Sequence, residues 1–150
     1  MAEGPMGSHW LRHLYNLPTM KRNPSENIKL LIVDDKIDNV EILEAALEQE
    51  GLDIITTSTP KQVIDLCIRN NIGIALIDVK MPGLDGFELL DLIKQNPLTK
   101  DIIVVLITGY STKSGDVVKG LNNGAADYLF KPLDLYHFSK SKIADYFNQA

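Results

Sequence analysis

From residue 28 onward, the chain alternates short apolar runs with longer segments whose apolar residues recur at helical spacing. Each apolar run is rich in branched side chains and too short for a helix, which is typical of a buried strand. The predicted strands cover residues 29–33, 53–57, 72–77, 102–107 and 126–130. Five such strands separated by helical segments predict an α/β fold built on a parallel sheet.

The segments between the strands carry the signals that start and stop helices. Apolar residues share one face after Asp38 until Gly51 stops the first helix, and Pro60 opens the second helix after a cap at Ser58 or Thr59. Further helices are predicted after the turn at 81–86, over residues 114–122 before the glycine at 124, and after Pro132 with Asp134 as cap.

The third and fourth strands are continuous apolar runs, which indicates a sheet covered by helices on both faces. Right-handed crossovers then predict a doubly wound five-stranded sheet of order 2-1-3-4-5, a flavodoxin-like sandwich. We expect one domain over residues 28–150. Residues 1–27 are expected to be a poorly ordered tag remnant, marked by Gly7-Ser8-His9, and a linker.

The composition is that of a globular protein and excludes some classes of protein. Apolar residues make up 45% of the chain and charged residues 23%, as in ordinary globular domains. A net charge of −5 gives no reason to expect nucleic acid as a direct partner. A single cysteine, Cys67, excludes an internal disulfide and suits a reducing compartment. The sequence has no apolar run long enough for a bilayer and no signal peptide, so we expect a cytoplasmic protein with no membrane contact.

Polar residues follow the predicted strands at their carboxyl ends. Asp34 and Asp35 end the first strand, Asp78 the third, Thr108 the fourth and Lys131 the fifth. A parallel sheet brings these ends to one edge, where ligands bind in doubly wound folds. Three carboxylates there would repel one another unless a hard cation such as Mg²⁺ lay among them. A carboxylate can also attack phosphorus, and Asp78, on the central strand, is the predicted nucleophile.

Each of these residues has an ordinary interpretation when taken singly. The acidic pair could be a solvated strand end, Asp78 a turn residue, Thr108 a strand-end hydroxyl and Lys131 a surface lysine. Their joint occurrence in four strings resembles the receiver domains of two-component response regulators, over residues 28–148. The strings are Val33-Asp34-Asp35, Ile77-Asp78-Val79-Lys80-Met81-Pro82-Gly83, Leu106-Ile107-Thr108-Gly109 and Tyr128-Leu129-Phe130-Lys131-Pro132.

The resemblance implies a signalling domain, not an enzyme, that takes a phosphoryl group from a histidine kinase or phosphotransfer protein with the help of Mg²⁺. Asp78 corresponds to the phosphoacceptor and a metal ligand, and Lys131 to the phosphoryl-binding lysine, with a cis bond expected before Pro132. The other implied roles are direct metal ligand for Asp35, ligand through metal-bound water for Asp34, backbone carbonyl ligand for Lys80, and switch pair for Thr108 and Tyr128.

The resemblance also implies where the signal goes. The responding surface is expected on the helix at 114–122, the fifth strand and the last helix. That last helix carries an apolar stripe and no glycine stop, so it could continue into an effector domain or kinase of the parent protein and form a phosphorylation-dependent homodimer. The stripe comprises Leu135, Phe138, Ile143, Tyr146 and Phe147.

Two side chains, Lys80 and Tyr110, are expected to flank the path of the water that hydrolyses the phosphorylated aspartate. Neither is a small acid or amide that could orient this water. The sequence therefore predicts slow intrinsic dephosphorylation.

Three other classes of protein were weighed. A haloacid-dehalogenase-type hydrolase would need a carboxylate where Lys80 stands. In a flavin-binding electron carrier, the acidic residues after the first strand would repel the flavin phosphate. A degenerate receiver that binds partners without phosphorylation is disfavoured by the complete set of acidic, hydroxyl and lysine residues. The kinase, the signal and the output are not identified by the sequence.

Overall fold

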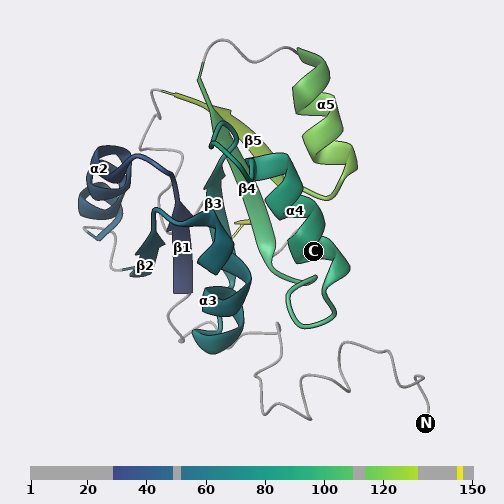
Figure 1. Cartoon of the computed structure of the whole chain (residues 1–150). Helices are drawn as coiled ribbons and strands as arrows, with labels where there is room; N and C mark the ends of the chain where they lie inside the picture. The colour runs from purple at the N-terminus through teal and green to yellow at the C-terminus, as the bar shows by residue number, and fades with distance from the viewer. Residues whose placement is uncertain (1–28, 49–51, 110–113, 132–144, 147–150) are drawn as a thin grey trace, which may run out of the picture.

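The computed structural model describes residues 29–48, 52–109, 114–131 and 145–146. Five parallel strands form one sheet in the order β2-β1-β3-β4-β5, which confirms the predicted fold class and strand order (Figure 1). The strands are β1 (Lys29–Val33), β2 (Asp53–Thr57), β3 (Ile74–Asp78), β4 (Ile103–Thr108) and β5 (Asp127–Phe130).

Helices cover both faces of the sheet (Figure 1). The helix α2 packs on one face, and α3, α4 and α5 pack on the other. Their bounds are α2 (Ile37–Glu48), α3 (Val63–Arg69) preceded by a single 3₁₀ turn η1 (Pro60–Gln62), α4 (Gly86–Gln95) and α5 (Ser114–Asn122). Among the described residues, no helix is both long and apolar enough to cross a membrane.

Alternate residues of the central strands point to opposite faces of the sheet and pack in two separate apolar cores. Leu31 and Val33 of β1 lie in the core under α3 and α4, whereas Leu30 and Ile32 lie in the core under α2. Every residue of β3 and β4 is buried, which explains their continuous apolar sequences. The only polar residues in these two strands are Asp78 and Thr108, and both stand at the carboxyl end.

The limits of β1, β2 and α5 are as predicted, and those of β3, β4 and β5 differ from the predicted ones by one or two residues. β3 begins at Ile74, because the amide of Ile72 donates to the carbonyl of Cys67 in a turn. Thr59 is the N-cap residue before Pro60 as predicted, but its side chain makes no capping hydrogen bond. The strand-end hydroxyl of Thr57 instead accepts from the amide of Thr59 at 3.0 Å. The hydroxyl that stabilises this turn thus belongs to Thr57 of β2 and not to the predicted cap residue.

Cys67 and Tyr146 lie in the two apolar cores. Cys67 is buried in the core under α3, and this burial raises the pKa of its thiol from 9.0 to about 12. Tyr146 is buried on the α2 side of the sheet, and its hydroxyl donates to Asp127 at 2.6 Å. Burial, followed by this hydrogen bond, raises the pKa of Tyr146 above its ordinary value. Tyr146 therefore packs within this domain and is not exposed on an apolar stripe.

Several predictions concern residues outside the described ranges. They are the tag and linker at 1–27, the cis bond before Pro132, the side chain of Tyr110, and the last helix apart from residues 145–146, which are helical.

Candidate functional site

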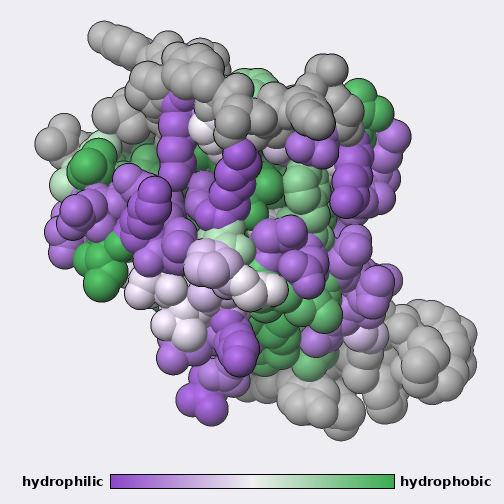
Figure 2. Space-filling model, turned by 45° about the horizontal axis from the view of Figure 1, so that its top comes forward, coloured by the Kyte–Doolittle hydropathy of each residue, from purple (hydrophilic) through white to green (hydrophobic). Residues whose placement is uncertain are grey.

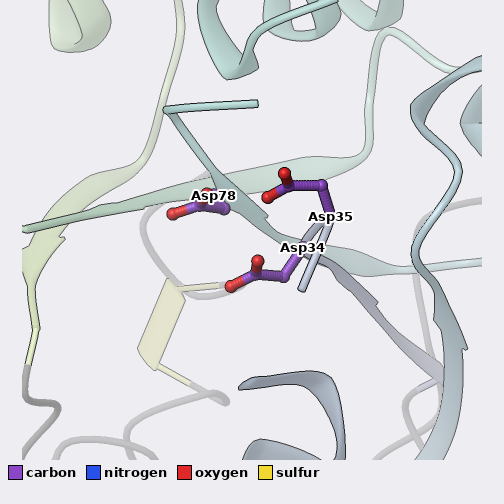
Figure 3. A group of neighbouring side chains, drawn as sticks. All are labelled: Asp34, Asp35 and Asp78. Carbon is purple, nitrogen blue, oxygen red and sulfur yellow. The ribbon is translucent and has the colours of Figure 1, made fainter. Parts of the chain in front are cut away.

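The carboxyl ends of β1 and β3 bring the predicted acidic residues together. Asp34 and Asp35 directly follow β1, and Asp78 is the last residue of β3. The parallel register pairs Val33 with Ile77, so the strands end side by side. One carboxylate oxygen from each of the three aspartates lies within 4.8 Å of the others, and the three side chains gather in one place (Figure 3).

Backbone hydrogen bonds hold this cluster in place. The amide of Asp34 donates to the carbonyl of Thr57 at 3.3 Å, which continues the β1–β2 pairing by one residue. Beyond Asp78, the amide of Val79 donates to the carbonyl of Ile107 at 2.8 Å and continues the pairing with β4. Asp34 and Asp78 are only 2% and 7% exposed, so their carboxylates are largely removed from water.

Lys131 reaches the cluster from the end of β5. Its amide donates to the carbonyl of Thr108 at 2.6 Å, and its ammonium contacts Asp34 Oδ2 at 3.0 Å and Asp78 Oδ1 at 3.2 Å. The sequence predicted that Lys131 lies beside the phosphoacceptor. It did not predict the ion pair with Asp34.

Three carboxyl groups lie close to the single ammonium of Lys131, and burial together with their mutual interactions shifts the pKa values of Asp78 and Lys131. Burial, and next the charge of Asp34, raise the pKa of Asp78, and the ammonium of Lys131 offsets this only in part. Burial alone would lower the pKa of Lys131, but its hydrogen bond to Asp34 and the charge of Asp78 outweigh burial and raise it. Lys131 therefore remains a cation beside the three carboxyl groups.

The donor set fits a hard divalent cation. The Oδ1 atom of Asp35 is buried, and none of the described residues donates a hydrogen bond to it. A buried carboxylate oxygen without a donor is costly, and oxygen ligands of this kind suit Mg²⁺. Asp34 is less available, because its two oxygens already accept from the amide of Lys36 and from Lys131. This difference favours Asp35 and Asp78 as direct ligands and an indirect role for Asp34.

Of the remaining predicted residues, Thr108 ends β4, Tyr128 lies within β5 and Lys80 follows β3. Thr108 is fully buried at the end of β4, and Tyr128 is buried in β5 with its ring centroid 5.7 Å from that of Phe130. Lys80 lies in the loop after β3, and its side chain is exposed. Tyr110 is outside the described residues.

Figure 2 looks toward the carboxyl ends of the strands. Hydrophilic residues cover most of the described surface there. Hydrophobic surface shows on the side where α2 lies and on the side where α5 lies. The exposed large apolar side chains of the described residues include Ile37 and Ile42 of α2 and Val118 and Leu121 of α5.

A glycine that the sequence analysis did not single out packs the start of α4 directly against the end of β3. The amide of Gly86 donates to the carbonyl of Val79 at 2.9 Å. A Cβ atom on Gly86 would lie 2.7 Å from the carbonyl oxygen of Asp78 and 2.8 Å from Val79 Cα. Both neighbours are backbone atoms, so a larger residue would have to shift the end of β3.

The residues around Gly86 also form a capping box. The carboxylate of Asp85 accepts from the amide of Glu88, and the carboxylate of Glu88 accepts from the amide of Asp85. The spacing Asp-x-x-Glu could have predicted this box. The contact of Gly86 with β3 has no comparable sequence signal.

The described residues thus form a doubly wound parallel sheet whose carboxyl edge holds three aspartates and a lysine. The sequence model of the response regulator receiver domain matches residues 30–141 of this chain. The chain therefore belongs to the response regulator receiver domain family.

Individual relatives agree with this assignment. The chain is 41% identical over 106 residues to the response regulator PleD of Caulobacter vibrioides, covering 71% of this chain and 23% of PleD. It is 37% identical over 103 residues to the response regulator SaeR of Staphylococcus aureus, covering 69% of this chain and 43% of SaeR. The chain thus spans less than half the length of these relatives.

A solved receiver domain from Clostridium thermocellum has the same fold. Its TM-score with this chain is 0.73 at 27% identity, and the match covers 81% of this chain and 95% of the solved one.

Replacing Gly86 with alanine tests the contact between α4 and the acidic site. Alanine usually favours a helix over glycine by about 1 kcal/mol. Here we expect Gly86→Ala to lower the free energy of unfolding by about 1–3 kcal/mol, because the methyl group must displace the backbone of β3. Urea unfolding of the variant measures this loss. Gly109→Ala is the matched control, since none of the described residues lies within 4 Å of its Cβ position; equal stability of the two variants would contradict the account.

Proposed function

We propose that this receiver domain accepts a phosphoryl group on Asp78 from a phosphohistidine of a histidine kinase or phosphotransfer domain. The observation that carries the proposal is the meeting of Asp78 with Asp34, Asp35 and Lys131 at one buried edge. The family membership supports it.

The chemistry follows from the position of Asp78. A carboxylate oxygen of Asp78 attacks the phosphorus, the bond from phosphorus to the donor's imidazole nitrogen breaks, and an aspartyl phosphate results. Lys131, whose ammonium lies 3.2 Å from Asp78 Oδ1, offers its charge to a phosphoryl oxygen. We expect the hydroxyl of Thr108 to donate to another. Asp35, Asp78 and the Lys80 carbonyl would hold Mg²⁺, with Asp34 acting through water, and the bound ion would supply positive charge to the transferred group.

The residues at this site disfavour two other classes of function. A dehalogenase-type hydrolase needs a second carboxylate two residues after its nucleophile, and here that residue is the exposed Lys80. A flavin carrier must bind a phosphate where this chain places Asp34 and Asp35. A cluster with excess negative charge would repel that phosphate unless a metal ion came with it.

We propose that the signal leaves through α5, β5 and the last helix, with Thr108 and Tyr128 as the switch pair. Exposed apolar side chains on this side, Val118, Leu121 and Phe130, support contact with a partner. That partner is an effector domain or kinase of the parent protein, and the last helix could add a phosphorylation-dependent homodimer. We further propose that residues 28–150 belong to the receiver domain and that it works in the cytoplasm.

Phosphorylation of one site is the direct expectation. In the presence of Mg²⁺ and acetyl phosphate, intact mass spectrometry should detect one phosphoryl adduct on the chain. The adduct should disappear in Asp78→Asn and when a chelator removes Mg²⁺. Asp85→Asn is a suitable control, because Asp85 caps α4 and lies outside the acidic cluster. An adduct that persists in Asp78→Asn would exclude Asp78 as the acceptor.

Lys80 and Tyr110 are proposed to keep the phosphorylated state long-lived. Hydrolysis needs a water in line with the breaking bond, and neither side chain has a small acid or amide group to orient it. We expect slow decay in the parent protein and faster decay in the double variant Lys80→Asn/Tyr110→Glu. The measurement is the loss of phosphorylated protein after removal of the donor with Mg²⁺ present. Equal decay rates would mean that the two side chains do not control the water.

A further inference from the structure

A small cluster of side chains joins α4, α5 and β5 next to the acidic site. We call Phe87, Lys119 and Tyr128 the aromatic bridge. The ring centroids of Phe87 and Tyr128 are 6.3 Å apart, and the ammonium of Lys119 lies 4.9 Å from the ring centroid of Phe87. The bridge thus connects α4 and α5, which lie on the same face of the sheet, with the edge strand β5 (Figure 1).

One end of the bridge is fixed to the backbone of the phosphoacceptor. Phe87 follows Gly86 in the first turn of α4, and Gly86 lies directly against the carbonyl of Asp78 and Val79 Cα. The hydrogen bond from the Gly86 amide to the Val79 carbonyl closes this contact at 2.9 Å. Close-packed atoms transmit displacement, because there is no free space to absorb it. A shift of the backbone at Asp78 and Val79 therefore moves the first turn of α4 and the ring of Phe87.

The other end of the bridge holds α5. Lys119 belongs to the last turn of α5, and the next residue is Gly120. A Cβ atom on Gly120 would lie 2.9 Å from Leu106 Cδ1 and 3.1 Å from Tyr128 Cδ2, so α5 lies directly on the ring of Tyr128. Lys119 then adds a second contact, from α5 to α4 through Phe87.

We propose that Phe87 and Lys119 are positioning residues that transmit the phosphorylation state of Asp78 to α5, by a route separate from the Thr108–Tyr128 pair. The inference rests on the proposed phosphorylation of Asp78. The position of α5 then depends on two contacts: its packing on Tyr128, which responds through Thr108, and the cation–π contact with Phe87, which responds through Gly86. Because the second contact needs both a cation and an aromatic face, it can be removed while the apolar packing is retained.

The test compares four forms of the full chain: the parent, Phe87→Leu, Lys119→Met and Lys119→Arg. Amide hydrogen exchange of residues 114–122 is measured with Mg²⁺, with and without beryllofluoride as the phosphoryl analogue. We expect beryllofluoride to change the exchange of α5 in the parent. Phe87→Leu and Lys119→Met should each reduce this change about three-fold, the scale of one exposed cation–π contact. Lys119→Arg should retain the change seen in the parent, because arginine keeps the cation. The Phe87→Leu/Lys119→Met double variant should show the same reduced change as either single variant.

A matched control is Lys61→Met, which removes an exposed lysine on the 3₁₀ turn η1. It should respond like the parent. If the parent responds and both single variants respond equally strongly, the route through Phe87 is overturned while the proposed function stands. If Lys119→Arg fails to retain the response, the cation–π contact does not carry it and the inference is also overturned. If Asp78 of the parent takes no phosphoryl group, the proposed function and the inference fall together.

Discussion

Three carboxylates share one ammonium at a nearly buried edge of the sheet, and the function depends on this imbalance. Removing ionised groups from water is expensive unless they are paired, and Lys131 contacts only Asp34 and Asp78. The buried Oδ1 of Asp35 has no hydrogen-bond donor among the described residues. The site is therefore suited to attract positive charge. The same feature accounts for the fit to Mg²⁺ and for the raised pKa of Asp78, which burial and the charge of Asp34 produce.

The doubly wound fold makes this concentration of charge possible. The strands β1, β3, β4 and β5 all end at one edge, and their buried apolar residues form the cores on both faces. Hydrogen bonds extend the strand pairing to Asp34 after β1 and to Val79 after β3, so the carboxylates are held at the end of the sheet. Helix α4 begins in contact with the same strand end through Gly86. A change at Asp78 would therefore occur in direct contact with the start of α4.

The sequence predicted the strands and the site because both depend on local patterns. Continuous apolar runs identified β3 and β4, and a polar residue after each run marked the carboxyl edge. The pairing of Lys131 with Asp34 joins residues 97 positions apart, and it depends on side-chain geometry that no local pattern encodes. The contact between Gly86 and Asp78 likewise depends on how closely a helix approaches a strand. The start of β3 was misplaced because Ile72 is apolar and buried but belongs to a turn.

Thermal unfolding with and without Mg²⁺ tests the central claim most directly. In metal-free buffer, Asp35→Asn should raise the unfolding midpoint, because it removes one of three repelling charges. Saturating Mg²⁺ should raise the midpoint of the parent by several degrees and that of Asp35→Asn by much less, since a ligand stabilises the folded state that binds it. Asp53→Asn, at an exposed position at the start of β2, should respond to Mg²⁺ like the parent. A parent midpoint that Mg²⁺ leaves unchanged, or a metal-free Asp35→Asn variant less stable than the parent, would contradict the account.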